Sequence, residues 1–199
     1  MTNEVIRHYD GLVAEENDPF RDPPVLQEYM DKWDGAEFLN ALALNGSETV
    51  LEIGVGTGRI AAKTAPLCAE LFGLDISPKT IERAKENLAD FKNIQLICDN
   101  FLNFDLDRKF DVVYSSLTFM HFEDKQMAVN KVAELLCDGG KFVLSIDKNR
   151  SESIDMGSYK LRVYPDTSEA IISCARNAGL CLKAQRETEF AHIMTFVKA

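Results

Sequence analysis

The chain has 199 residues, a length that suits one folded domain with a sizeable core. Hydrophobic residues make up 46% of it and charged residues are interspersed among them, so we expect a globular fold rather than disorder. The formal net charge of −10 repels phosphate backbones and argues against nucleic acid as a partner. No apolar run approaches the ~20 residues of a membrane span, so we expect no membrane partner either.

The cysteines and the beginning of the chain indicate a compartment. The first residues are neither basic nor followed by an apolar core, so we expect no signal peptide. Five cysteines are scattered without a C-x-x-C pair, which favours reduced thiols and argues against a zinc site. We therefore expect a cytoplasmic protein without a bound metal.

Helices are expected before the first strand. A proline pair at residues 23–24 forms a rigid break that can open a helix over residues 25–33. Gly35 separates this segment from a second expected helix over residues 36–44. A turn at residues 45–47 then leads into the sheet.

Residues 50–61 carry the most informative pattern of the chain. The short aliphatic run Val50–Ile53 predicts a buried strand. Gly54, Gly56 and Gly58 predict a tight turn in which the backbone comes close to a ligand, since no Cβ intervenes. A helix is expected over residues 59–67, and its first amides would point at whatever the turn holds. Together these elements form a nucleotide-binding corner at the carboxyl end of a parallel strand.

The glycine spacing separates two classes of nucleotide site. The dinucleotide pattern G-x-G-x-x-G would need glycine at position 59, where Arg59 stands. The pattern E-x-G-x-G-x-G that begins at Glu52 resembles motif I of class I S-adenosylmethionine-dependent methyltransferases. Their cofactor carries a sulfonium, an ammonium and a carboxylate but no phosphate, so an acidic residue at the strand end suits it. A glycine-rich turn in another α/β fold is the alternative. The resemblance implies cofactor contacts by Glu52, Ile53, Gly54, Gly56, Thr57 and Gly58.

The second and third expected strands also end in acidic residues. A strand over residues 70–75 ends at Asp75, about 20 residues after the first glycine, which is the spacing of a ribose-binding carboxylate. Ser77 and Pro78 supply the cap of the next helix and would leave Asp75 free for a ligand; the alternative is that Asp75 is itself a plain cap. The resemblance implies that Ile76 also contacts the cofactor.

The third expected strand covers residues 94–98 and precedes Asp99. The resemblance implies that Asp99 binds the exocyclic amine of adenine and that Asn100 offers its backbone amide to the ring. Phe101 would lie against the adenine face, or pack in the core instead.

The fourth expected strand, over residues 110–114, begins a segment that resembles motif IV of the family, F-D-x-V followed by small residues. The resemblance implies that Ser115 and Leu117 lie close to the methionyl part of the cofactor. Many small-molecule methyltransferases carry two consecutive histidines here, and this chain has only the second, His121. This side chain is a candidate general base or acceptor-binding group, and a structural histidine is the alternative.

The remaining pattern completes the expected fold. A helix over residues 125–136 ends in a glycine turn at 138–140, and a strand follows over residues 141–146. A helix over 168–178 precedes two strands, at 180–184 and 192–197, which predict a terminal antiparallel hairpin. We therefore expect an α/β, Rossmann-like, doubly wound sheet of seven mostly parallel strands with a C-terminal antiparallel hairpin and helices on both faces.

The resemblance covers roughly residues 45–199. It implies a methyltransferase domain over residues 47–199 and a helical lid over residues 1–46, because in the family such a leading segment often lies over the cofactor. Tyr9, Tyr29 and Trp33 are candidate substrate contacts in that lid, with ordinary helix packing as the alternative. Tyr164, in a polar stretch without a clear period, is a further candidate.

The reaction that the resemblance implies is direct methyl transfer from S-adenosylmethionine to a small-molecule acceptor, with S-adenosylhomocysteine as the product. The sulfonium is already a strong leaving group, so neither a metal nor a covalent enzyme intermediate is demanded. The chain would act as a monomer or homodimer. Two rival interpretations are a nicotinamide-dependent oxidoreductase and an S-adenosylmethionine-binding module without catalysis.

Overall fold

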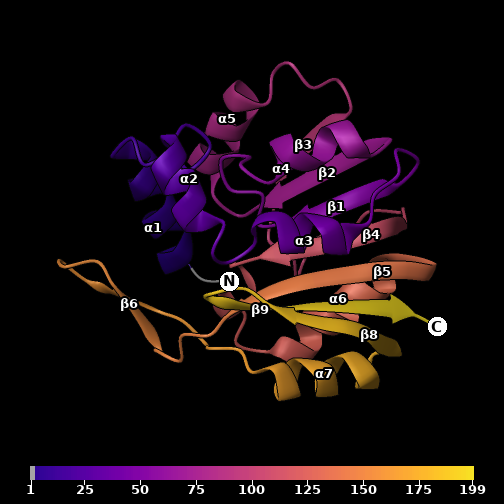
Figure 1. Ribbon diagram of the computed structural model, residues 1–199. Helices are drawn as coiled ribbons and strands as arrows, with labels where there is room; N and C mark the ends of the chain where they lie inside the picture. The colour runs from indigo at the N-terminus through magenta and orange to yellow at the C-terminus, as the bar shows by residue number, and fades with distance from the viewer. Residues whose placement is uncertain (1–2) are drawn as a thin grey trace.

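The structure, a computed structural model, describes residues 3–199 (Figure 1). Its centre is a seven-stranded sheet with the strand order β3-β2-β1-β4-β5-β9-β8. The first five strands run parallel, whereas β9 runs antiparallel to both of its neighbours. The fold that the sequence predicts is therefore confirmed. The strands of this sheet are β1 (Thr49–Ile53), β2 (Glu70–Asp75), β3 (Ile94–Cys98), β4 (Phe110–Ser116), β5 (Leu136–Asp147), β8 (Leu180–Glu187) and β9 (Ala191–Lys198).

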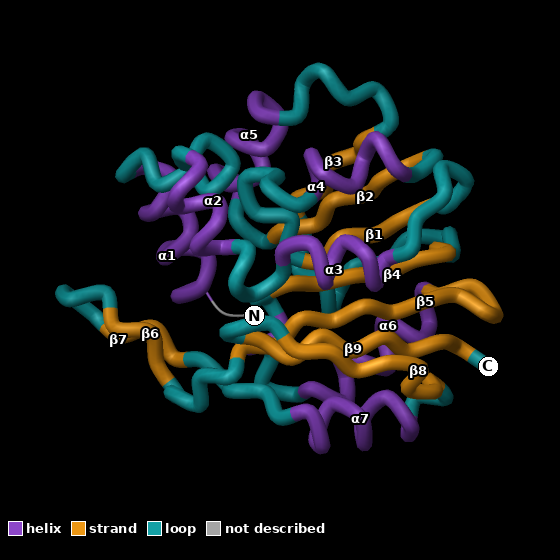
Figure 2. The backbone as a smooth tube through the Cα atoms, viewed as in Figure 1, coloured by secondary structure: helices purple, strands orange, loops and turns teal. Residues whose placement is uncertain are grey.

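Helices cover both faces of the sheet (Figures 1 and 2). Alternate residues of β1 enter two separate cores, as the two-residue period of a strand requires. Val50 packs in the same cluster as Phe38, and Leu51 in the same cluster as Val129. Both faces of the parallel strands are thus buried. The helical elements are α1 (Asn3–Ala14), α2 (Pro24–Met30), α3 (Gly35–Leu42), α4 (Ala61–Thr64), η1 (Ala65–Leu67), α5 (Pro78–Asn87), η2 (Phe119–His121), α6 (Lys125–Leu135) and α7 (Ser168–Asn177).

Several predicted boundaries are wrong, and a polar stretch for which no element was predicted contains two short strands. The helix expected over residues 59–67 begins at Ala61 and becomes a 3-10 turn at Ala65, because Pro66 has no amide to donate. The glycine turn expected at 138–140 lies inside β5, where the pairing with β4 shifts register beside Gly139, whose φ is +76°. The polar stretch 147–164 contains a small hairpin, β6 (Ser153–Asp155) with β7 (Lys160–Arg162), which lies next to α1 in Figure 2.

The N-terminal segment lies across the carboxyl ends of the parallel strands (Figure 1). Asp10 of α1 accepts a hydrogen bond from Ser77 Oγ at the start of α5, at 2.6 Å. Asp18 accepts from Asn87 at 3.1 Å and from Arg83 at 3.3 Å, and both partners belong to α5. These bonds hold the segment over the carboxyl ends of the strands, where parallel α/β folds bind their ligands.

Within residues 3–199 the structure contains neither a helix suited to cross a membrane nor a candidate metal-binding cluster. None of the helices there has the length and apolar character that crossing a membrane requires. No cluster of three or more histidine, cysteine, aspartate or glutamate side chains in this range is arranged to hold a metal ion.

Candidate functional site

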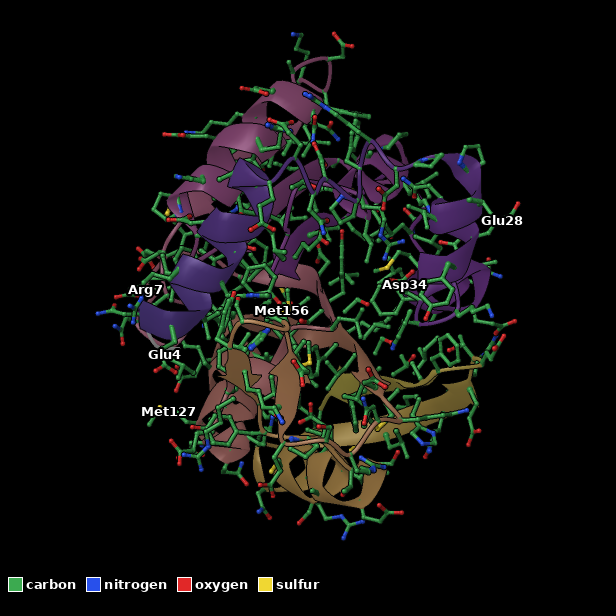
Figure 3. The ribbon with its side chains drawn as sticks, turned by 90° about the vertical axis from the view of Figure 1, so that its left-hand side faces the viewer. Glu4, Arg7, Glu28, Asp34, Met127 and Met156 are labelled. Atoms are coloured by element: carbon green, nitrogen blue, oxygen red, sulfur yellow. The ribbon has the colours of Figure 1, made fainter. Side chains whose placement is uncertain are left out.

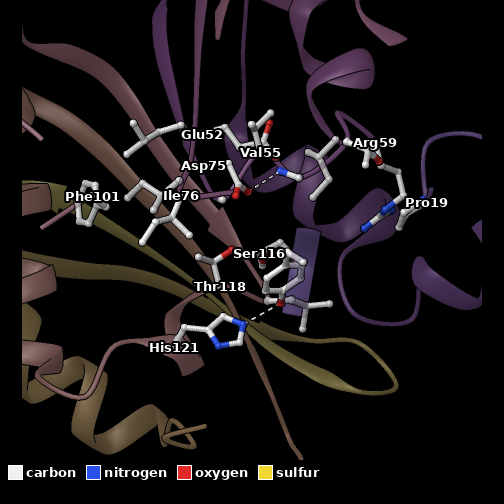
Figure 4. A pocket seen from close by; sticks show the side chains of 18 of the residues that line it. Pro19, Glu52, Val55, Arg59, Asp75, Ile76, Phe101, Ser116, Thr118 and His121 are labelled. Atoms are coloured by element: carbon white, nitrogen blue, oxygen red, sulfur yellow. Dashed lines mark hydrogen bonds between the residues drawn. The ribbon is translucent and has the colours of Figure 1, made fainter. Parts of the chain in front are cut away.

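A cavity of about 250 Å³ opens at the carboxyl ends of β1, β2, β3 and β4 (Figure 4). Its wall includes all three strand-end acids, Glu52, Asp75 and Asp99. Neighbouring predicted residues also line it, and α1 closes one side through Val5 and Tyr9. The predicted site residues that the structure brings together here are Tyr9, Glu52, Ile53, Gly54, Gly56, Thr57, Asp75, Ile76, Asp99, Phe101, Leu117 and His121.

The glycine turn has the backbone that the sequence indicates. Gly54, Gly56 and Gly58 have φ values of +79°, +56° and +100°, a region that favours glycine. A Cβ on Gly54 would stand 2.7 Å from Thr118 Cγ2, and one on Gly58 would stand 2.7 Å from Leu88 Cδ1. Gly56 has no heavy atom within 4 Å of that position. Neighbouring side chains therefore leave no room for a Cβ at Gly54 and Gly58, whereas the space beside Gly56 is open.

Asp75 joins the turn to the cavity. One carboxylate oxygen accepts the Gly56 amide at 3.0 Å, and the other accepts the Ser77 amide at 2.9 Å. Ser77 caps α5 as expected, since its side chain accepts from the Thr80 amide. Asp75 is thus not free of protein partners, but each of its oxygens keeps a second lone pair for a ligand. Burial raises the pKa of Asp75 above its ordinary value.

Glu52 is the most deeply buried of the three acids, with 2% of its surface exposed. Burial raises its pKa to about 8, although a hydrogen bond from the Tyr114 hydroxyl, at 2.8 Å, opposes this rise. Tyr114 is itself held by Thr64 at 2.8 Å. Near neutral pH the carboxyl is therefore mostly protonated, and a cation beside it would favour the ionised form.

A buried ion pair connects the glycine corner to the N-terminal segment. Arg59, which lines the cavity, is hydrogen-bonded to Asp34 at the start of α3 and lies 3.4 Å from Asp31. The same Asp34 oxygen accepts from Ser116 Oγ, at the end of β4, at 3.0 Å. Because Asp34 serves both partners, this network fixes three segments around the cavity.

His121 and Tyr9 form a pair in the wall of the cavity. Tyr9 Oη lies 2.8 Å from His121 Nε2, and the rings meet edge to face (Figure 4). Burial lowers the pKa of His121 to about 4, so the imidazole is neutral near pH 7. Burial raises the pKa of Tyr9, which therefore stays protonated. The Tyr9 hydroxyl and Nε2 thus bind each other, and His121 Nδ1 is buried without a hydrogen-bond partner among the described residues.

A family model described as a methyltransferase domain matches residues 51–144, which include the end of β1, all of β2 to β4 and the acids of the cavity. Malonyl-[acyl-carrier protein] O-methyltransferase 1 of Ilyobacter polytropus is 34% identical over 104 residues, covering 51% of this chain and 39% of that protein. An uncharacterized methyltransferase of Anoxybacillus flavithermus is 34% identical over 123 residues, covering 60% of this chain and 57% of that protein.

Residues 51–144 of the chain are therefore similar to the methyltransferase-domain family. The matches span less than two thirds of each of these relatives. The fold agrees over the whole chain: the N-methyltransferase NodS of Bradyrhizobium japonicum, solved with S-adenosylhomocysteine, superposes with a TM-score of 0.75 at 18% identity, covering 98% of this chain and 99% of that chain.

Several predicted site residues lie outside the cavity. Tyr29 and Trp33 pack against each other and against Phe190, with ring centroids 4.7–5.8 Å apart. Ser115 is buried and donates to the Ile53 carbonyl. None of these three side chains therefore lines the cavity. Others that do not line the cavity are Gly58, Asn100 and Tyr164.

The cavity also contains residues that sequence reasoning did not assign to the site. In the sequence, Arg59 is notable only because it stands where the dinucleotide pattern needs a glycine. Its position directly after Gly58 was nevertheless a signal that it lies at the site. Thr118 directly follows the predicted Leu117, whereas Met30 had no local signal, since it enters the wall through the packing of a distant segment.

Proposed function

We propose that this protein binds S-adenosylmethionine in the cavity at the strand ends and transfers the methyl group to a small-molecule acceptor. The observation that carries the proposal is the convergence of Glu52, Asp75 and Asp99 on one cavity beside a glycine turn. Carboxylates suit the cation, the ribose hydroxyls and the adenine amine of this ligand, and they would repel a pyrophosphate.

Each acid has a separate proposed role. Asp75 accepts hydrogen bonds from the ribose hydroxyls through its unused lone pairs, while the glycine turn that it supports approaches the methionyl part. Glu52 faces the cationic end of the cofactor, and its burial strengthens that interaction. Asp99 accepts from the adenine amine, with Phe101 beside the ring. The wall is completed by Ile53, Thr57, Ile76 and Leu117, and support from outside it comes from Gly58, Asn100 and Ser115.

The proposed reaction is a direct displacement. A lone pair of the acceptor attacks the methyl carbon as the carbon–sulfur bond breaks, and S-adenosylhomocysteine leaves with a neutral thioether. The protein contributes mainly alignment, which can be worth about 7–11 kcal/mol in favourable cases.

His121 is the proposed base when the acceptor is a hydroxyl. In the tautomer whose Nε2–H donates to Tyr9 Oη, Tyr9 orients the ring and Nδ1 keeps the lone pair that can take the proton the hydroxyl loses on attack. The low pKa limits how strongly it pulls the proton, so we assign it the role of a weak, well-placed base.

Residues 1–46 are the proposed lid. Val5 and Tyr9 line the cavity, and the bonds of Asp10 and Asp18 to α5 attach this segment over the strand ends. Closure would exclude water from the reacting atoms. We further propose that the protein acts in the cytoplasm, as a monomer or homodimer, and not on nucleic acid, given its net charge of −10.

Two measurements test the proposed function. Calorimetry should show that S-adenosylmethionine and S-adenosylhomocysteine bind and that NAD does not. Release of S-adenosylhomocysteine should rise above the background rate when a screen supplies small hydroxyl, amine and carboxylate compounds. Binding of NAD alone would support the oxidoreductase instead. Binding of S-adenosylmethionine without methylation of any acceptor in the screen would support a non-catalytic binding module.

A further inference from the structure

A second cavity, of about 410 Å³, adjoins the first one. The two cavities share Val5 and His121, so the imidazole stands between them. The side chains that line the second cavity come from α1, from η2, and from the end of β7 and the segment after it. Those residues are Asn3, Glu4, Val5, Arg7, His121, Arg162 and Tyr164.

Hydrogen bonds attach the hairpin segment to the η2 turn and to α1, the elements that line the second cavity. The Tyr164 amide donates to the Met120 carbonyl at 2.8 Å, which fixes the end of the hairpin segment beside the η2 turn. His8 Nδ1 of α1 lies 2.8 Å from the Tyr159 hydroxyl in the hairpin. The second cavity is therefore a defined extension of the site. Figure 3 views this side, with Glu4 and Arg7 on α1 and Met156 in the turn between β6 and β7.

The second cavity has a positive balance of charge. Two arginines, Arg7 and Arg162, face one glutamate, Glu4, and His121 is neutral near pH 7. Within residues 3–199 neither arginine has a carboxylate partner at ion-pair distance, although most arginines of this acidic chain do. The balance of one positive charge matches a single carboxylate.

Arg162 is prepared for planar recognition. Its guanidinium lies over the Tyr164 ring, 5.0 Å from the centroid, which limits the orientation of its plane. A guanidinium held in this way keeps its N–H groups in the plane, where a carboxylate can accept two of them at once. Arg7 is also bonded only to a backbone carbonyl, that of Asn3 at 3.4 Å.

We infer that the methyl acceptor carries a carboxylate, which Arg162 and Arg7 bind in the second cavity while the acceptor's reacting atom reaches past His121 toward the cofactor. This inference rests on the proposed function, because it names the acceptor class of that same site. It also assigns Arg162 as a specificity-determining residue.

Binding to the protein loaded with S-adenosylhomocysteine tests the inference. The probes are 4-hydroxybenzoate, 4-aminobenzoate and 3-hydroxybutyrate, each paired with its own amide, which has the same shape without the charge. We expect at least one acid to bind with a Kd of about 1 mM or tighter, and about fivefold more tightly than its amide. Added salt should weaken the binding of the acid and leave the binding of the amide unchanged.

Two variants locate the effect. Arg162→Gln should abolish the preference for the acid and leave the affinity for S-adenosylhomocysteine unchanged. Lys160→Gln is the matched control, since Lys160 is a cation on the same strand, is 68% exposed and does not line the second cavity; it should keep the preference.

The outcomes separate the two claims. Equal binding of acids and amides, a preference that survives in Arg162→Gln, or no binding of any acid to the loaded protein would overturn the inference and leave the proposed function standing. Failure of S-adenosylhomocysteine itself to bind would overturn the proposed function, and the inference with it.

Discussion

At the scale of single residues, Glu52 links the charge of the cofactor to the chemistry of the cavity. Its pKa is raised to about 8 by burial, so near pH 7 only a minor fraction is ionised. A sulfonium or ammonium beside the carboxyl would favour the ionised form and lower that pKa. Binding of the cofactor should then release a proton, which makes the affinity depend on pH.

The sign of this dependence follows from linkage. The ionised form that binds the cation becomes more populated as the pH rises toward and past 8, so affinity for S-adenosylmethionine should rise, by up to about tenfold between pH 7 and pH 9. Calorimetry at several pH values measures it. In Glu52→Gln the contribution of residue 52 to this pH dependence should vanish. Only the titration of the amine of S-adenosylmethionine itself should then remain. A profile identical in both proteins would show that Glu52 does not face the cation.

Gly54 tests the geometry of the turn. In Gly54→Ala the new methyl group would stand 2.7 Å from Thr118 Cγ2, and it would also carry the strain of a φ near +79°. We expect affinity for S-adenosylmethionine to fall by more than about tenfold, since the turn must move. Gly139→Ala is the matched control, because Gly139 has a φ of +76° with nothing near its Cβ. Equal affinity in both variants would contradict the proposed role of the turn.

At the scale of elements, the strands were predictable and the contacts between distant elements were not. The parallel strands are short apolar runs that end in acidic residues, so sequence alone located the tips of β1, β2 and β3. The hairpin of β6 and β7 is polar and has no period, and it left no such signal. The contacts of Tyr9 with His121 and of Arg59 with Asp34 join residues 112 and 25 positions apart, and only the folded chain brings them together.

Within the expected helical lid no separate helix was predicted over residues 3–14, yet α1 lines the cavity there, and its attachment can be tested. Asp10 accepts from Ser77 Oγ at 2.6 Å and from the Lys79 amide at 3.2 Å. In Asp10→Ala we expect faster amide hydrogen exchange across residues 3–14 and a several-fold weaker affinity for S-adenosylmethionine, because a loosened lid must be ordered on binding. Glu15→Gln, a change of charge just after α1 at a residue without such bonds, should change neither. Exchange confined to other segments would contradict the assignment of α1 as part of a lid.

At the scale of the whole molecule, the sheet gathers negative charge at one edge of an already acidic protein. Burial, together with weaker repulsion from neighbouring carboxylates, raises the pKa values of Glu52 and Asp75, so ionising both groups is unfavourable without a cation. The sheet topology creates this arrangement, because the ends of β1, β2 and β3 are neighbours in the order β3-β2-β1. A phosphate-free cationic nucleoside satisfies such an edge, whereas a pyrophosphate would add to the repulsion.

The most direct test of this account is the affinity for S-adenosylmethionine of the wild type and of Asp75→Ala, measured by calorimetry. Asp111→Ala serves as the control, since Asp111 also accepts a backbone amide, that of Thr49 at 2.9 Å, but lies at the opposite end of the sheet. The account predicts tight binding by the wild type and the control, and a loss on the order of 1.5–3 kcal/mol in Asp75→Ala, which is about 10–150-fold. Unchanged affinity in Asp75→Ala, with the cofactor still bound, would contradict it.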